Sequence, residues 1–217
     1  MVDNFNTIKQ LITFDDSEVG ISLDQDSDAF YQVQLIKRKK DNPTMKGDCL
    51  VFKRYQIDKL SDLDKYYDEI ITLCDTFNLR AYFEVARKSY KQVTLDSLVE
   101  LSQRVANNDF KKVHSIIDSC TSKYANSSHK RWVVDIDDGD SDTLSLDELF
   151  EFYTEIISTK CRPGHTVIGK VPTKSGLHLI TKPFDLQTFS KLIHETGINK
   201  PIDELVKKKV STILYCN

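Results

Sequence analysis

The spacing of apolar positions along the 217-residue chain predicts alternating strands and helices. Apolar and polar residues alternate with the two-residue period of strands in some segments, and recur three and four residues apart, as in helices, in others. In the first half, the predicted strands are 30–37, 49–57 and 80–86. The predicted helices there are 1–12, 60–77 and two segments within 94–123, and an acidic loop is expected at 15–28.

The second half follows a polar segment at 121–130 and reads strand, helix, strand, strand, helix, strand. Its predicted strands are 131–137, 165–171, 176–182 and 209–216, and its predicted helices are 145–159 and 184–196. This order is typical of one sheet with helices on one face. We therefore predict an α/β (α+β) fold in a single domain over 1–217. A first lobe at about 1–127 would precede an RRM-like lobe at about 128–217.

Composition narrows the class of protein. Apolar content of 40% and charged content of 29% are typical of a globular chain, and the net charge of −3 gives no overall footprint for nucleic acid. No apolar run approaches membrane-spanning length, and 1–13 lacks a signal-peptide pattern, so no membrane partner is expected. Five cysteines without a C-x-x-C pair predict free thiols in a reducing, intracellular or cytoplasmic compartment. We also expect that a chain of this size fits a virus or mobile element.

The first candidate site is an acid pair in the segment R-W-V-V-D-I-D-D-G at 131–139. Side chains alternate along a strand, so Asp135 and Asp137 are expected on one face. Two neighbouring carboxylates repel unless a cation lies between them, and oxygen ligands suit Mg²⁺ or Mn²⁺. The alternative is a solvent-facing strand, whose charges discourage edge-to-edge aggregation.

A second candidate cluster lies about forty residues later, at a predicted β-turn. It consists of Lys170, Lys174, Ser175, Gly176 and His178. Backbone amides and cations at such a turn are able to hold a nucleoside triphosphate, Gly176 would let the backbone approach closely, and His178 would donate to a phosphate oxygen. A hairpin turn also favours Lys, Ser and Gly for purely local reasons.

Two basic segments are candidate nucleic-acid contacts. A run of four basic residues contains Arg38 and Lys39, and the strand expected to end at residue 86 is followed by Arg87 and Lys88, next to a tyrosine. Cations that track phosphates, interleaved with aromatic groups that stack on bases, suit a nucleic-acid strand. Each segment also suits an ordinary solvated loop.

Together, D-x-D at Asp135 and Asp137 and K-S-G-L-H-L at 174–179 resemble motifs I and II of the archaeo-eukaryotic primase (primase-polymerase) superfamily. The most similar pattern is that of the polymerase domain of bacterial end-joining DNA ligases, although here Ser175 is inserted between the Lys and the Gly. The resemblance covers 131–185. It implies a primase-polymerase-like catalytic core and metal-dependent transfer of nucleotides from NTP or dNTP to a 3′-hydroxyl of DNA or RNA. Asp135 and Asp137 would bind the metal, and His178 would bind nucleotide phosphate.

The sequence departs from that family at the last strand, where the family has a third acid and 209–216 has none. Asp138 or Asp140 are the candidates to replace it. One alternative is therefore a catalytically degenerate primase-fold protein that binds nucleic acid or nucleotide within a replication or repair assembly. Another is a metal-dependent phosphoesterase that uses Asp135, Asp137 and His178.

Overall fold

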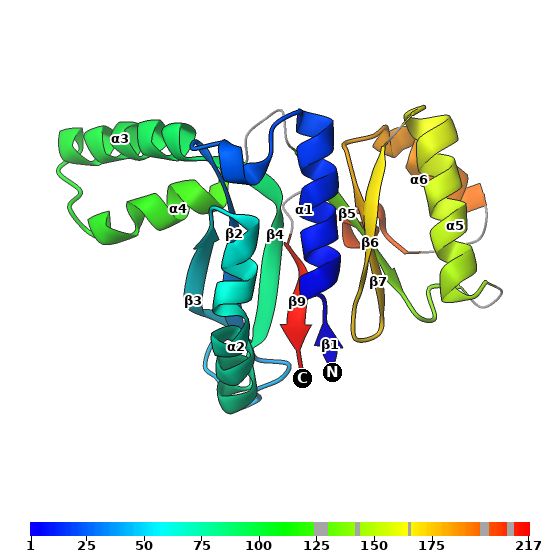
Figure 1. Ribbon diagram of the computed structural model, residues 1–217, viewed down its shortest axis with the longest axis horizontal. Helices are drawn as coiled ribbons and strands as arrows, with labels where there is room; N and C mark the ends of the chain where they lie inside the picture. The colour runs from blue at the N-terminus through cyan, green and yellow to red at the C-terminus, as the bar shows by residue number, and fades with distance from the viewer. Residues whose placement is uncertain (124–129, 142–143, 165, 196–199, 208–210) are drawn as a thin grey trace.

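In the computed structural model, the chain forms two antiparallel sheets that lie side by side (Figure 1). The structure describes residues 1–123, 130–141, 144–164, 166–195, 200–207 and 211–217. The first sheet has the strand order β1-β9-β4-β2-β3 and the second β6-β7-β5-β8. The strands are β1 Val2–Asp3, β2 Ala29–Arg38, β3 Cys49–Ile57, β4 Arg80–Ser89, β5 Trp132–Asp137, β6 Val167–Pro172, β7 Gly176–Thr181, β8 Val206–Lys207 and β9 Ser211–Cys216.

Helices surround these sheets, so the predicted mixed α/β class is confirmed. They are α1 Phe5–Val19, α2 Leu60–Phe77, α3 Tyr90–Ala106, α4 Ile116–Lys123, α5 Leu146–Ile156, α6 Leu186–Glu195 and α7 Ile202–Leu205. Single-turn pieces are η1 Leu23–Gln25 and η2 Val113–Ser115, and a π-helical turn, Ile157–Cys161, continues α5. None of the helices in the described ranges is long and apolar enough to cross a bilayer. The five cysteines are free thiols, as predicted.

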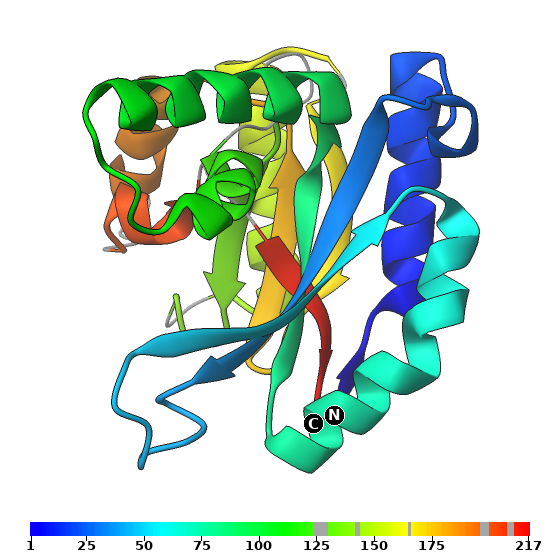
Figure 2. The ribbon, with the colours of Figure 1, turned by 90° about the vertical axis from the view of Figure 1, so that its left-hand side faces the viewer.

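Helices α1 and α2 lie on the same side of the first sheet (Figure 2) and contribute to one apolar core with it. Helix α1 is longer than the sequence predicts, because it continues through Asp15 into the segment expected to be a loop. Asp15 is buried, where it accepts hydrogen bonds from Tyr31 Oη at 2.8 Å and from Arg131 Nε at 3.0 Å. A carboxylate with such partners is stable in the protein interior. The prediction that the acidic segment from residue 15 is a loop was therefore wrong for residues 15–19, which are helical.

The second sheet has the predicted β-α-β-β-α-β connectivity, with β5 between β7 and β8. Its two faces differ because side chains alternate along each strand. One face packs on α5 and α6 through Val134, Ile136, Leu177 and Leu179. The opposite face carries Val133, Asp135, Asp137 and His178, and its apolar members join the core around α1. The acid pair therefore faces the first half of the molecule.

The last strand does not lie where the sequence order suggests. The segment 209–216 was expected to complete the second sheet, but β9 pairs with β1 and β4 in the first sheet, and the strand beside β5 is β8. Residues 212–216 of β9 are all buried. A strand buried on both faces needs neighbours on both edges, which the position between β1 and β4 supplies.

Candidate functional site

Asp135 and His178 form the centre of the site. They lie directly opposite each other on β5 and β7, with His178 Nε2 3.2 Å from Asp135 Oδ1. The other ring nitrogen, Nδ1, lies 2.8 Å from the hydroxyl oxygen of Thr212 on β9. Burial raises the pKa of Asp135, but the hydrogen bond and charge of His178, with the charges of Lys200 and Lys207, outweigh it and lower the pKa overall. Through this contact Thr212 orients the imidazole. Thr212 is fully buried, so its hydroxyl is not reachable as a nucleophile.

A second cluster adjoins the first at the end of β5. Lys200 Nζ donates to Asp137 Oδ2 at 2.9 Å, to Asp140 Oδ2 at 2.9 Å and to the main-chain oxygen of Asp135 at 3.1 Å. The tight turn that brings Asp140 back has Gly139 at φ +95°, a conformation that favours glycine. Burial lowers the pKa of Lys200, but its hydrogen bonds and attraction to the two carboxylates raise it overall.

These residues suit one hard cation better than a pair of metal ions. Among the described residues no group of three His, Cys, Asp or Glu side chains could hold a metal ion by itself. Two carboxylates and a carbonyl nevertheless converge on one point, and Mg²⁺ is commonly bound by one or two carboxylates together with waters and substrate phosphates. Asp137 and Asp140 are therefore the residues that could hold such an ion, and Lys200 now occupies the point between them.

Most of the predicted phosphate-binding turn lies beside this cluster. Asp138 N donates to Ser175 O at 2.8 Å, and Lys174, exposed on the hairpin, donates to Asn217 O at 3.3 Å. Gly176 permits a close approach of backbone to backbone, and its contact with a phosphate stays a prediction. A Cβ there would overlap the Ile136 carbonyl oxygen and lie 2.8 Å from Asp137 Cα, so glycine permits the close approach of β7 to β5. That contact fixes the spacing between the hairpin and the acid pair.

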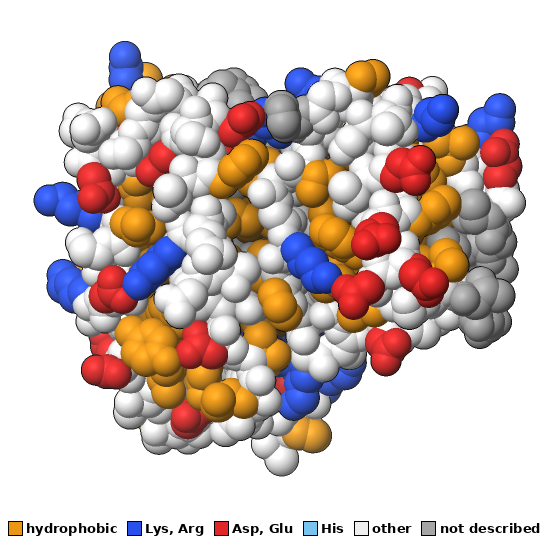
Figure 3. Space-filling model, turned by 45° about the vertical axis from the view of Figure 1, so that its right-hand side comes forward, with side chains coloured by type: hydrophobic (Ala, Val, Ile, Leu, Met, Phe, Trp, Pro, Cys, Tyr) orange, Lys and Arg blue, Asp and Glu red, His pale blue; other side chains and the backbone are white. Residues whose placement is uncertain are grey.

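Lys170 does not join the turn, which corrects the prediction for this residue. Its Nζ lies 2.7 Å from Asp147 Oδ1 and 4.6 Å from the ring centroid of Phe150, both on α5. Helix α5 packs on the face of the second sheet opposite to His178. Acidic side chains gather on the side of the molecule that carries α5 (Figure 3), which makes this side a poor surface for phosphates.

The prediction that Arg87 and Lys88 contact nucleic acid is wrong, because their side chains are only 2% and 3% exposed. Strand β4 runs on to Ser89 instead of ending at residue 86, and this extension draws both cations inside. Arg87 pairs with Asp16 at 2.8 Å, and Lys88 pairs with Glu84 at 2.6 Å. Cations held in this way do not reach a nucleic-acid backbone.

The other predicted nucleic-acid contacts lie at the tip of the β2–β3 hairpin. Arg38 is half-buried and donates from Nη1 to Tyr82 Oη at 3.0 Å, whereas Lys39 is exposed. Exposed Lys40 and Lys46 lie in the same connection. Contact between nucleic acid and Arg38 or Lys39 stays a prediction. The exposed surface around Lys39 also includes Lys40 and Lys46.

The sequence did not predict two residues of the site, Lys200 and Thr212. Lys200 belongs to no motif and reaches the acids from the segment before α7. Thr212 lies on the strand noted only for lacking an acid, and the assignment of that strand to the second sheet concealed its contact with His178. Of the two candidates to replace the third acid, Asp140 is the one that joins Asp137, through Lys200.

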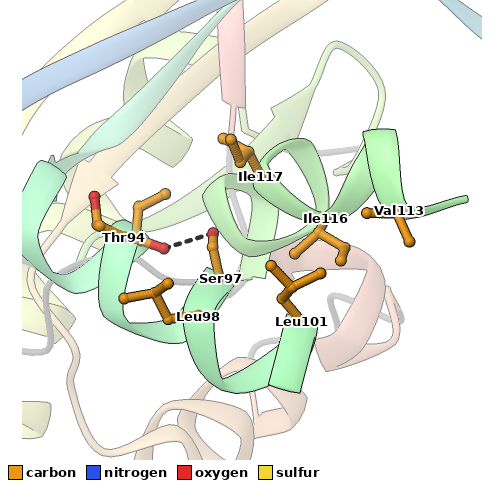
Figure 4. Close-up of a pocket in the computed structure, with 8 residues that line it drawn as sticks. Thr94, Ser97, Leu98, Leu101, Val113, Ile116 and Ile117 are labelled. Carbon is orange, nitrogen blue, oxygen red and sulfur yellow. Dashed lines mark hydrogen bonds between the residues drawn. The ribbon is translucent and has the colours of Figure 1, made fainter. Parts of the chain in front are cut away.

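An apolar pocket of about 340 Å³ lies between α3 and α4, away from these charges (Figure 4). Val93, Thr94, Ser97, Leu98, Leu101, Val113, Ile116 and Ile117 line it. Ser97 Oγ donates back to Val93 O at 2.7 Å. The lining contains no ionisable group, so it is not the site of the predicted chemistry.

Comparisons with known proteins do not name a family. Neither the protein-family models nor the curated proteins nor the solved structures include a match to this chain.

Proposed function

We propose that this chain is a primase-polymerase-like nucleotidyltransferase, which adds nucleotides from a nucleoside triphosphate to a nucleic-acid 3′-hydroxyl. The observation that carries the proposal is the direct pairing of Asp135 with His178 across β5 and β7, with Asp137 and Asp140 at the same end. This pairing joins the D-x-D and G-L-H motifs that motivated the resemblance. The β-α-β-β-α-β order of the second sheet is a further support.

Each residue of the site has a task in this proposal. Asp137 and Asp140 would hold Mg²⁺ or Mn²⁺, with Asp135 beside them. When bound there, a divalent ion would supply positive charge against the triphosphate and would favour ionisation of the attacking hydroxyl. His178 Nδ1 is held by Thr212, and its Nε2, 3.2 Å from Asp135 Oδ1, would donate to a phosphate oxygen after it leaves that carboxylate. Lys174 and Ser175 would contact the outer phosphates from the hairpin.

The nucleic-acid strand would bind the cations of the β2–β3 hairpin. Lys39, Lys40 and Lys46 are exposed there, and Phe52 on β3 is an exposed aromatic side chain, 5.0 Å from the ring of Phe77. Exposed lysines attract phosphates, and an exposed ring offers a face on which a base stacks. Single-stranded nucleic acid has unpaired bases and therefore fits this combination better than a duplex.

A catalytically degenerate binding protein is the second candidate, and two observations favour it. Thr212 is the residue of β9 that reaches His178, whereas the resemblance implies an acid on a late strand. Lys200 already supplies a cation to Asp137 and Asp140. Such a protein would bind nucleotide or nucleic acid as an accessory subunit without incorporating nucleotides.

An incorporation assay with Mn²⁺ and labelled nucleotides distinguishes the two candidates. We expect product from the wild type, with and without a primer. Asp137→Asn should lose at least about a hundredfold, because even residues that only support a metal ligand contribute roughly 10–100-fold. Asp147→Asn is the matched control, since this exposed acid of α5 pairs with Lys170 on β6, away from the site.

The proposed activity is contradicted if Asp137→Asn and the wild type give equal product. It is also rejected if the folded wild type gives none. Binding of labelled nucleotide or oligonucleotide by an inactive wild type would support the accessory protein.

A further inference from the structure

Lys200 uses its full capacity for hydrogen bonding at the site. An ammonium group has three N–H donors, and here three oxygens, from Asp137, Asp140 and the Asp135 main chain, accept at 2.9, 2.9 and 3.1 Å. The side chain is 14% exposed, so little of it faces solvent. This arrangement differs from a surface salt bridge, in which one flexible cation meets one carboxylate.

The position of this ammonium is the position where a divalent ion would bind. Carboxylate and carbonyl oxygens are the ligands that Mg²⁺ and Mn²⁺ use, and here they point at a single centre. An ammonium and a divalent ion cannot share that centre, because they would overlap and repel. Occupation by one therefore excludes the other.

We propose that Lys200 is a tethered cation that fills the metal position in the nucleotide-free protein and leaves it when a divalent ion binds. The inference rests on the proposed function, since it concerns the same carboxylates. Lys200 keeps the carboxylates of Asp137 and Asp140 from repelling each other in the absence of metal, and it weakens the binding of free metal. The four-carbon stem of lysine lets the ammonium turn toward the triphosphate once displaced.

The test compares Mn²⁺ binding, followed by electron paramagnetic resonance without nucleotide, in three proteins. Lys200→Met removes the tethered cation and keeps the length of the side chain. Lys207→Met is the matched control, because Lys207 also contributes positive charge near Asp135 but donates to Asp203 O instead of to the site. We expect Lys200→Met to bind Mn²⁺ about tenfold more tightly than the wild type, because Mn²⁺ no longer has to displace a charged group hydrogen-bonded to the carboxylates. The Mn²⁺ affinity of Lys207→Met should change far less.

Equal gains in both variants would overturn the proposal, because they would show a general charge effect. An unchanged Mn²⁺ affinity in Lys200→Met would overturn it as well. Neither outcome depends on catalysis, so the proposal and the proposed activity fail separately. Tight Mn²⁺ binding by Lys200→Met without incorporation by the wild type would reject only the activity.

A measurement on the wild type decides the matter if Lys200→Met does not fold. Acetylation of each lysine by a water-soluble reagent is followed by mass spectrometry with and without saturating Mn²⁺. We expect Mn²⁺ to speed the modification of Lys200 several-fold relative to Lys207, since the displaced amine loses its three acceptors. An unchanged ratio would contradict the displacement.

Discussion

Two groups of ion pairs in this molecule join a basic residue to an aspartate but differ in how far solvent reaches the aspartate. In the first group, Arg87 and Arg131 are enclosed with their partners Asp16 and Asp15. In the second, the pairs of His178 and Lys200 involve Asp135 and Asp137, whose side chains are 30% and 46% exposed. Enclosed pairs hold the structure together, and partly exposed pairs remain able to exchange partners. Exposure of Asp135 and Asp137, and not the presence of a charge, separates these two acids of the site from the scaffold. Asp140, the other partner of Lys200, is 12% exposed and is as enclosed as Asp16 at 18%.

The largest expected effect comes from breaking an enclosed pair. Asp15→Ala would leave Arg131 buried without its carboxylate, and Tyr31 without its acceptor. We expect the free energy of unfolding to fall by about 3–5 kcal/mol, as for other buried pairs that lose one partner. Urea denaturation measures it. Asp147→Ala, which breaks the exposed pair with Lys170, should cost less than about 1 kcal/mol. Similar losses in the two variants would undo the distinction.

The close approach of the two central strands gives the next largest effect. Gly176→Ala would force a methyl group against the β5 backbone at Ile136 and Asp137. We expect a loss of at least about 1–3 kcal/mol in thermal or urea unfolding, since overpacking displaces backbone here and not a flexible side chain. Gly47→Ala is the control, because a Cβ at Gly47 has open space. A wild-type-like Gly176→Ala would mean that β7 and β5 are farther apart than described.

A smaller effect should appear in the pH dependence of stability. The pKa of Asp135 is lower in the folded protein than its ordinary value, so the folded state binds fewer protons than the unfolded state in that range. The contribution of Asp135 is therefore present above a pH of about 4 and is lost as pH falls through the lowered pKa. Asp135→Asn should flatten this part of the stability profile, measured by urea unfolding at several pH values. An unchanged slope would contradict the pairing with His178.

The smallest expected effect concerns the exposed lysines of the β2–β3 hairpin. Lys39→Ala should leave stability unchanged and reduce the salt dependence of oligonucleotide binding by about one unit of slope, as for one lost phosphate contact. Fluorescence anisotropy at several salt concentrations measures it. Lys170→Ala on the acidic α5 side should leave the slope unchanged. The hairpin would be excluded as a contact if both variants behaved alike.

The sequence predicted those parts of the fold that depend on local periodicity. Strand alternation placed Asp135 and Asp137 on one face, and the strand order predicted a sheet in which His178 is able to face them. Ser145 followed three residues later by Glu148 is the sequence pattern of a capping box, and both of its hydrogen bonds are present at the start of α5. These features depend on neighbours within one element or one hairpin.

Long-range partners determined what the sequence did not predict. Arg87 and Lys88 have the basic-aromatic pattern of a contact surface, but their acids come from distant segments or from the strand itself. Strand β9 has no local feature that assigns it to the first sheet, and the role of Thr212 depends on that assignment. Lys200 likewise becomes part of the site only through the tertiary fold. Burial and pairing across the chain are not encoded in any short motif.

Titration of a non-hydrolysable nucleoside triphosphate in the presence of Mn²⁺ tests the central claim most directly. We predict that the wild type and Asp147→Asn bind it with similar affinity, and that Asp137→Asn binds it at least about tenfold more weakly, because it loses a charged ligand. Absence of binding to the wild type, or equal binding by all three proteins, would show that the acids at the end of β5 are not a nucleotide site.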